Sequence, residues 1–160
     1  MPNWAVGDLK IRGKKDVIIS FMQAEIHAYD YSGKRTSREI EEDFENYFSI
    51  STNPKKGLLW IDALGRCMLS ETHIWFEFFN ERAGGKEILV LADVQFAWDI
   101  DVSKLLLASK AYDLDFHIYA FERGMQFNRN VEIISGEIVK NEEIKFNNYE
   151  WDCICPSKGG

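Results

Sequence analysis

Cysteine, long apolar runs and positive charge are all scarce in this chain. The cysteines number three among 160 residues, an odd count that provides no disulfide framework of the kind that staples small secreted domains. No stretch approaches the roughly 20 apolar residues that a membrane-spanning helix needs, and the N-terminus lacks the charged and then apolar pattern of a secretory signal. We therefore expect a cytoplasmic protein that does not enter a membrane.

Lysine and arginine total 19 against 26 aspartates and glutamates, which gives a formal net charge of -7. This balance argues against broad electrostatic binding to nucleic acid or to an anionic membrane, because both surfaces are negative. It leaves room for a protein partner with a basic surface. We therefore expect a protein partner in preference to direct nucleic-acid binding.

Apolar and aromatic residues are plentiful, at 46% and 14% of the chain. Such a composition is typical of a folded globular protein, and the length fits one domain with a sizeable core. We expect a single domain over 1–160, with its core drawn from about 1–28 and 58–150. An insertion would occupy about 29–57, and a flexible tail about 152–160.

The stretch from Asp99 to Asn141 has the clearest local pattern. Asp101 is a suitable N-cap, because its carboxylate can accept the free amides of a first helical turn, and helical spacing then continues to Tyr112. Residues 116–121 alternate with the period of a strand, and Gly124 follows where a turn is needed. This pattern predicts a helix over 101–112 followed by a meander of antiparallel strands.

Three further segments complete the expected elements. A strand over 4–11 should carry a bulge near Gly7 and lead to a helix over 14–22. Thr36 and Glu39 have capping-box spacing, which predicts a second helix inside the insertion. Strands are expected at 58–62, 73–78 and 88–98, with a Gly84-Gly85 hairpin turn between the last two.

Together these elements predict an α+β fold. We expect an antiparallel sheet with helices on one face and a small inserted helical segment. The side chains expected in its core are Trp4, Leu9, Ile11, Phe21, Ile40, Phe44, Leu59, Phe76, Leu89, Leu91, Phe96, Leu105, Phe116, Ile118, Val131 and Ile133.

Several short motifs at the two ends of the chain resemble a known family. They are the opening Met1-Pro2-Asn3-Trp4, Gly13 after the first strand, Phe96-Ala97-Trp98 ahead of a helix, and the stretch 119–136 with Glu122, Gly124, Phe127 and a closing Ser135-Gly136-Glu137. In these motifs the chain is similar to the YubB ferredoxin-like family of phages, plasmids and other mobile elements. The resemblance implies a ferredoxin-like sheet and an uncharacterised accessory role, and it carries no catalytic residue over to this chain.

A dense acidic stretch follows Thr36. In the predicted helix, Ile40, Phe44, Tyr47 and Phe48 would form the buried stripe, and the carboxylates would lie off it. Glu41, Glu42 and Glu45 could then engage a basic host protein, such as a defence or regulatory protein, with charge steering the encounter. The simpler interpretation is a solvated helix face. On the first interpretation the protein is a non-enzymatic accessory binding protein of a mobile element.

An aromatic strand gives the alternative function. His117, Tyr119 and Phe121 share one face of a strand, and Arg123 follows them. Such a face could bind a small molecule or a nucleotide, as aromatic platforms on open sheets do, in a binding protein or a small enzyme. The simpler interpretation is a second core face covered by the 29–54 insertion.

Signals for metal or catalytic chemistry are weak. Cys153 and Cys155, with Cys67 and His73, could supply zinc ligands, but their spacing does not match a zinc knuckle, and buried or tail thiols explain them as well. Asp99, Asp101, Asp113 and Asp115 flank the predicted helix, where caps and loop positions explain them more simply than metal binding. We therefore assign no cofactor, no metal and no catalytic residue.

Overall fold

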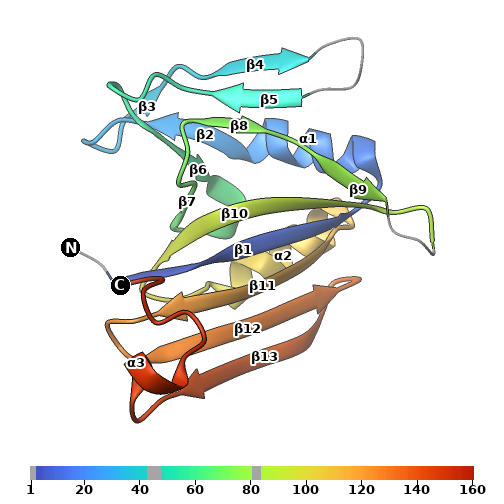
Figure 1. Cartoon of the computed structure of the whole chain (residues 1–160). Helices are drawn as coiled ribbons and strands as arrows, with labels where there is room; N and C mark the ends of the chain where they lie inside the picture. Colours follow the sequence, from blue (N-terminus) through green and yellow to red (C-terminus); the bar gives the residue numbers. More distant parts are fainter. Residues whose placement is uncertain (1–2, 43–47, 81–83) are drawn as a thin grey trace.

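The computed structural model describes residues 3–42, 48–80 and 84–160 of the chain (Figure 1). It is mostly β-structure, with 48% of residues in strands and 19% in helices. A ten-stranded antiparallel sheet has the order β13-β12-β11-β1-β10-β7-β6-β2-β3, and β9 also pairs with β10. A three-stranded sheet has the order β4-β5-β8.

The elements have the following bounds. The large sheet contains β1 (Trp4–Gly13), β2 (Ile26–Tyr29), β3 (Arg35–Thr36), β6 (Leu58–Ile61), β7 (Cys67–Met68), β9 (Phe78–Asn80), β10 (Glu87–Ala97), β11 (Asp115–Glu122), β12 (Phe127–Ile134) and β13 (Glu137–Lys145). The small sheet contains β4 (Glu39–Glu42), β5 (Phe48–Ser51) and β8 (His73–Trp75). The helices are α1 (Lys15–Glu25), α2 (Val102–Tyr112), α3 (Tyr149–Asp152) and the 3-10 turn η1 (Asp62–Leu64).

β1 is the central strand, with β10 on one side and β11 on the other. Its register with β10 shifts between Gly7 and Leu9, which confirms the bulge expected near Gly7. At this bulge the backbones come very close, because a Cβ on Gly7 would overlap the carbonyl of Tyr119. Glycine is therefore required at this position for β1 and β11 to pair.

The helix expected after Asp101 is confirmed. The Asp101 carboxylate accepts a hydrogen bond of 3.1 Å from the amide of Lys104, and α2 ends where Asp113 takes a left-handed conformation with φ 54°. Leu105 and Ala108 are buried in the main core. The helix expected over 14–22 also forms, as α1, and runs three residues further, to Glu25.

The ferredoxin-like prediction is wrong, because the chain forms a wide, mostly β-structure with small helices. The inserted helix is also wrong, since its predicted stretch holds β3, β4 and the start of β5. Of the expected apolar stripe, Ile40 is 41% exposed on β4, whereas Phe48 is buried. Phe48 and Ile50 are buried as members of β5, which pairs with both β4 and β8. Tertiary pairing with a distant strand thus overrides a local helical pattern.

Most of the expected core is confirmed. The following expected side chains are at most 3% exposed: Leu9, Ile11, Phe21, Leu59, Phe76, Leu89, Leu91, Phe96, Leu105, Phe116, Ile118, Val131 and Ile133. Ile40 is not part of it, and Trp4 is only half-buried. Phe44 and Tyr47 lie outside the described residues.

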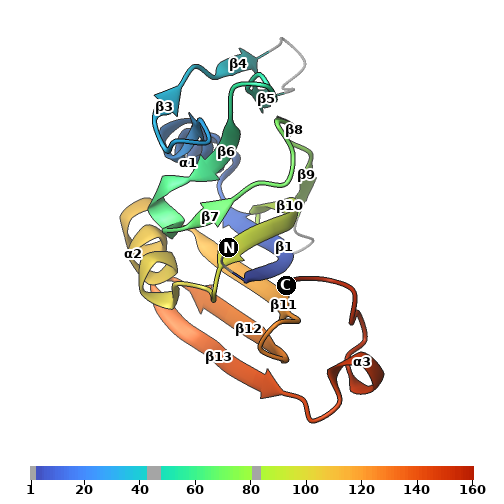
Figure 2. The ribbon, with the colours of Figure 1, turned by 90° about the vertical axis from the view of Figure 1, so that its left-hand side faces the viewer.

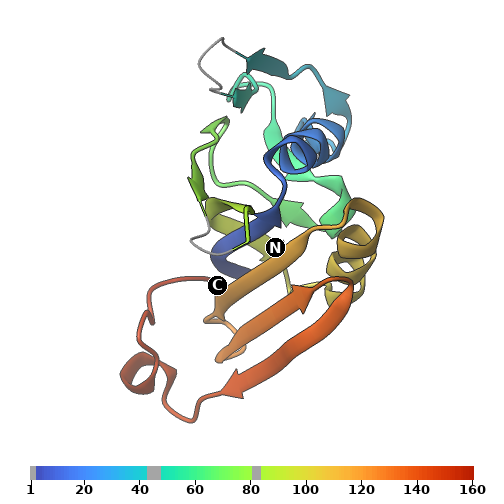
Figure 3. The ribbon, with the colours of Figure 1, turned by 90° about the vertical axis from the view of Figure 1, so that its right-hand side faces the viewer.

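A second, smaller core lies on the other side of the large sheet. α2 and α3 lie on opposite sides of this sheet (Figure 2 and Figure 3). Phe121, Tyr149 and Cys153 are buried together, with Tyr119 and Phe146 packed against them. The last residue returns to the first strand, where the Gly160 amide donates to the Trp4 carbonyl at 2.9 Å. None of the helices in the described residues is long and apolar enough to cross a membrane.

Candidate functional site

An aromatic hollow of about 500 Å³ opens beside β2, β6 and β7. We call it the aromatic pocket. Its lining includes the rings of Trp4, Trp60, Tyr29 and Tyr31, the side chains of Leu58 and Met68, and the charged residues Asp30, Asp62 and Arg66.

Strand alternation explains why these side chains meet. In β6, Leu59 and Ile61 are fully buried, so Leu58 and Trp60 lie on the opposite face of the strand. Tyr29 of β2 is opposite Leu58, and Met68 of β7 is opposite Trp60. The same face of three neighbouring strands therefore supplies most of the pocket.

Trp4 reaches this face from β1, the strand that is central in the sheet. Its ring centroid lies 6.3 Å from that of Trp60, with the two ring planes inclined at 58°. Both tryptophans are half-buried, and Tyr31, in the turn after β2, is 75% exposed. The pocket is thus walled by rings that keep part of their faces open to solvent.

Asp62 is the charged group of the pocket that is held by side chains of β2 and β3. Its Oδ2 accepts hydrogen bonds from Tyr29 Oη at 2.8 Å and Arg35 Nη2 at 3.1 Å. His27 Nδ1 lies 3.0 Å from the same oxygen, without hydrogen-bond geometry. The hydrogen bond to Asp62 raises the pKa of Tyr29, because losing its proton would place a second negative charge beside the carboxylate.

Asp30 and Arg66 differ in how far they are engaged. Oδ1 of Asp30 accepts from the amide of Ser32 at 2.8 Å, its hydroxyl at 2.7 Å and the amide of Lys34 at 2.9 Å. These bonds, led by the Ser32 hydroxyl, lower the pKa of Asp30. Arg66 is exposed, and within the described part of the chain its guanidinium has no hydrogen-bond or ion-pair partner.

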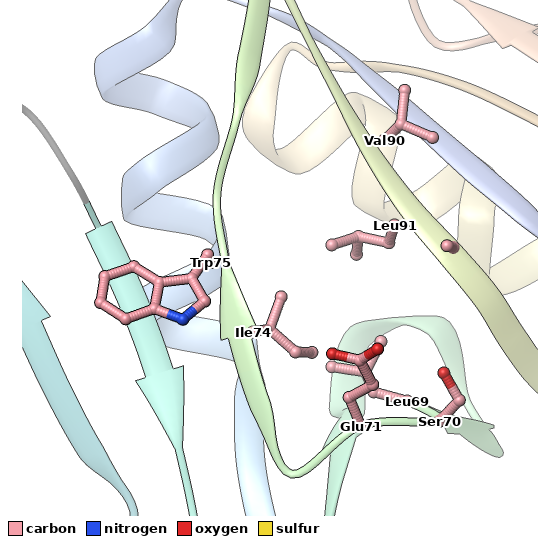
Figure 4. Close-up of a pocket in the computed structure, with 8 residues that line it drawn as sticks. Leu69, Ser70, Glu71, Ile74, Trp75, Val90 and Leu91 are labelled. Atoms are coloured by element: carbon pink, nitrogen blue, oxygen red, sulfur yellow. The ribbon is translucent and has the colours of Figure 1, made fainter.

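A second hollow, of about 160 Å³, lies between β10 and the segment that leads into β8 (Figure 4). Leu91 and Ile74 point toward each other across it, whereas the ring of Trp75 points away from β10. Glu71 is the charged residue of its lining. This hollow is smaller than the aromatic pocket, and the ring of Trp75 is turned away from β10. The aromatic pocket is therefore the better candidate.

The predicted aromatic platform on β11 is largely occupied by the protein itself. His117 Nε2 lies 3.2 Å from Asn130 Oδ1, and Phe121 is only 7% exposed beneath the C-terminal segment. Tyr119 Oη accepts from Asn128, and Arg123 Nε lies 3.9 Å from Glu150. The cover over this face comes from α3 and its neighbours, not from the 29–54 insertion as expected.

The predicted acidic residues are placed on a strand edge. Glu41 and Glu42 are exposed on β4, which pairs with β5 on one side. Glu45 lies outside the described residues. No ion pair involves Glu41 or Glu42 among the residues that the structure describes. Their carboxylates are therefore available to solvent or to a partner.

The cysteines do not gather into a site. Cys67 is buried in the main core, where burial raises the pKa of its thiol, while Cys153 is buried in the second core and Cys155 is exposed. Over the described ranges, no group of three or more His, Cys, Asp or Glu side chains is placed to hold a metal ion. Of the four aspartates around α2, Asp99 lies 3.1 Å from Arg129, Asp101 caps the helix, Asp115 binds Arg12 and Lys86, and Asp113 is exposed.

The aromatic pocket was missed by sequence reasoning, which assigned Trp4 to the core and did not single out Trp60 or Tyr29. A signal was present in Leu58-Leu59-Trp60-Ile61, a strand that is apolar on both faces and so needs a second cover or a ligand. Comparison with protein-family models, curated proteins and solved structures gives no match for this chain. The function proposed for this protein therefore rests on the geometry of the aromatic pocket.

Proposed function

We propose that this protein binds a small molecule with a planar ring in the aromatic pocket. The observation that carries the proposal is the hollow of about 500 Å³ walled by Trp4, Trp60, Tyr29 and Tyr31. Pockets that hold small organic ligands usually measure about 300–1,000 Å³ and combine apolar walls with a few polar groups. Small-molecule binding was the alternative function suggested by the sequence. We now assign it to the face formed by β2, β6 and β7 in place of the β11 face.

The two tryptophans supply the physical basis for ring binding. Flat aromatic side chains favour offset or edge-to-face contact with another ring, worth about 0.5–1.5 kcal/mol beyond the burial of apolar area. Trp4 and Trp60 are inclined at 58°, so a ring lying flat on one of them would meet the other near its edge. The bonds that Asp62 and Asp30 already accept favour binding over catalysis, because they engage the carboxylates of the lining.

Calorimetric titration with 2-naphthalenemethanol, a neutral planar probe, tests the proposal. We expect saturable binding that weakens about tenfold or more in Trp60→Ala, since stacking and apolar burial are both lost. Trp151→Ala is the matched control, because Trp151 is 84% exposed on α3. Tyr31→Ala should also weaken binding, and it should leave the fold intact because this ring is 75% exposed. Binding that ignores Trp60 and Tyr31 would contradict the proposal.

A second candidate is binding of a basic host protein through β4, in an accessory protein of a mobile element. It is favoured by Glu39, Glu41 and Glu42, which are all exposed on one short strand. Exposed charges act over roughly 8–10 Å near physiological ionic strength, so such binding would weaken as salt rises. Pull-down from host lysate with wild type and with Glu41→Lys, Glu42→Lys, at low and high salt, tests it. Unchanged partner recovery with the fold intact by circular dichroism would exclude this surface.

A further inference from the structure

The charged side chains that line the aromatic pocket differ in how many partners they have within the protein. Both carboxylates of its lining already accept hydrogen bonds, Asp62 from Tyr29 and Arg35, and Asp30 from its own turn. A cationic ligand would have to compete with these bonds. Of these two carboxylates, Asp62 is paired with the cation Arg35, whereas Asp30 keeps its negative charge and is held in its own turn by uncharged donors.

Arg66 is the remaining charged residue of the pocket lining. It is exposed at the start of β7, and its backbone is fixed because its carbonyl accepts from the amide of Ala97 at 3.1 Å. Within the described ranges its guanidinium has no partner. A guanidinium presents donors in a planar fork that matches a carboxylate, sulfonate or phosphate, and such charge-assisted bonds are about twice as strong as neutral ones.

We propose that the ligand of the aromatic pocket is an aromatic anion, whose ring packs on Trp4 and Trp60 and whose anionic group pairs with Arg66. The inference rests on the proposed function and adds the charge of the ligand to it. An anion gains a partner at Arg66 without displacing a bond of the protein. A cation meets the same guanidinium as a like charge, and a neutral ring leaves it unused.

Three probes that share one ring system separate ring binding from charge preference. They are 2-naphthoate, 2-naphthalenemethanol and 2-naphthylmethylammonium, titrated into the wild-type protein by calorimetry at low salt. We expect 2-naphthoate to bind about three- to tenfold tighter than the neutral alcohol, since an exposed charge pair contributes modestly, and the ammonium to bind weakest. Higher salt should reduce the advantage of the anion and leave the alcohol unchanged.

Variants of Arg66 then assign the preference to this residue. Arg66→Gln should bring 2-naphthoate to the affinity of the alcohol, whereas Arg66→Lys should keep part of the difference as a point charge without the planar fork. Arg123→Gln is the matched control, since Arg123 is an exposed arginine near α3.

Two kinds of failure can be told apart in this design. If the ammonium binds tightest, or if an anion preference survives Arg66→Gln, the charge assignment is overturned while ring binding stands. The same holds if naphthoate and the alcohol bind equally. If no probe binds, or Trp60→Ala changes nothing, the proposed function itself fails and the inference fails with it.

Discussion

Asp115 is a buried carboxylate of the large sheet that pairs with two cations. It is 6% exposed, and its Oδ2 lies 2.9 Å from Arg12 Nε and 3.0 Å from Lys86 Nζ. Its Oδ1 accepts from the amide of Ser135 at 2.9 Å, which ties β11 to the β12–β13 turn. Burial opposes ionisation of this carboxyl, but the Ser135 amide and the two cations outweigh it and lower the pKa.

We expect Asp115→Asn to lower the free energy of unfolding at pH 7 by about 2 kcal/mol, because Arg12 and Lys86 each lose the buried carboxylate as one of their contacts. A lowered folded-state pKa means that the stability from Asp115 is present above the ordinary value of 3.8 and is lost as pH falls through the folded-state value. Urea unfolding between pH 7 and pH 3 should therefore show a smaller acid loss in the variant than in wild type. Asp113→Asn, at an exposed position, should change little. Equal acid slopes in wild type and Asp115→Asn would contradict the assignment.

At the scale of elements, α3 closes the second core, and Tyr149 is its most buried side chain. Tyr149 is fully buried, and its hydroxyl donates to Asn128 Oδ1 at 2.9 Å. Asn128 is also fully buried, and its amide nitrogen donates to Tyr119 Oη at 3.2 Å. The C-terminal segment is thus tied to β12 and β11 by a short chain of polar groups inside an apolar cluster.

Removing the hydroxyl in Tyr149→Phe leaves the buried Asn128 Oδ1 with only the weak Cys153 thiol donor at 3.9 Å, which costs about 1 kcal/mol. Hydrogen exchange should show faster exchange of the amides in 149–153 before those of β1, because the contact holds α3 and not the central sheet. Tyr31→Phe is the control, since that ring is exposed and its loss of one hydroxyl should change little. A Tyr149→Phe protein with wild-type exchange over α3 would show that packing alone holds the segment.

Elements with strong local signals were predictable from the sequence, and those decided by distant pairing were not. The Asp101 cap, α2 and the bulge near Gly7 each follow from a few neighbouring residues. The stretch after Thr36 has a helical apolar pattern, yet β5 pairs with β8, more than 20 residues further along the chain. No local pattern records that partner.

The candidate site was hidden from the sequence for the same reason. Trp4 and Trp60 are far apart in the chain and lie on strands that are not neighbours, because β10 and β7 separate β1 from β6. Their meeting depends on the strand order of the whole sheet. Trp4 was expected in the core and is only half-buried, because neither the side of the sheet nor the companions of each ring can be read from the sequence.

At the scale of the whole molecule, the large sheet ends in a long edge strand. β13 lies at the outer edge of the sheet (Figure 1), and Ile138 and Val139 on it are 47% and 58% exposed. An exposed edge with apolar side chains is a template for pairing with another chain, and charged residues and bulges guard against it. β13 carries both, since its register with β12 shifts near Ile138, and Lys140, Glu142, Glu143 and Lys145 follow.

We expect Lys140→Val combined with Glu143→Val to promote self-association, because β13 then becomes a longer apolar edge. The net charge stays the same, since one charge of each sign is removed, so a change in overall repulsion cannot explain the result. Sedimentation velocity over a range of protein concentrations should show larger species forming at lower concentration than in wild type. Lys55→Val with Glu71→Val makes the same charge change at exposed positions outside the strands, and should leave sedimentation as in wild type. If both double variants associate equally, added surface hydrophobicity is the cause, and the guarding role of the β13 charges is contradicted.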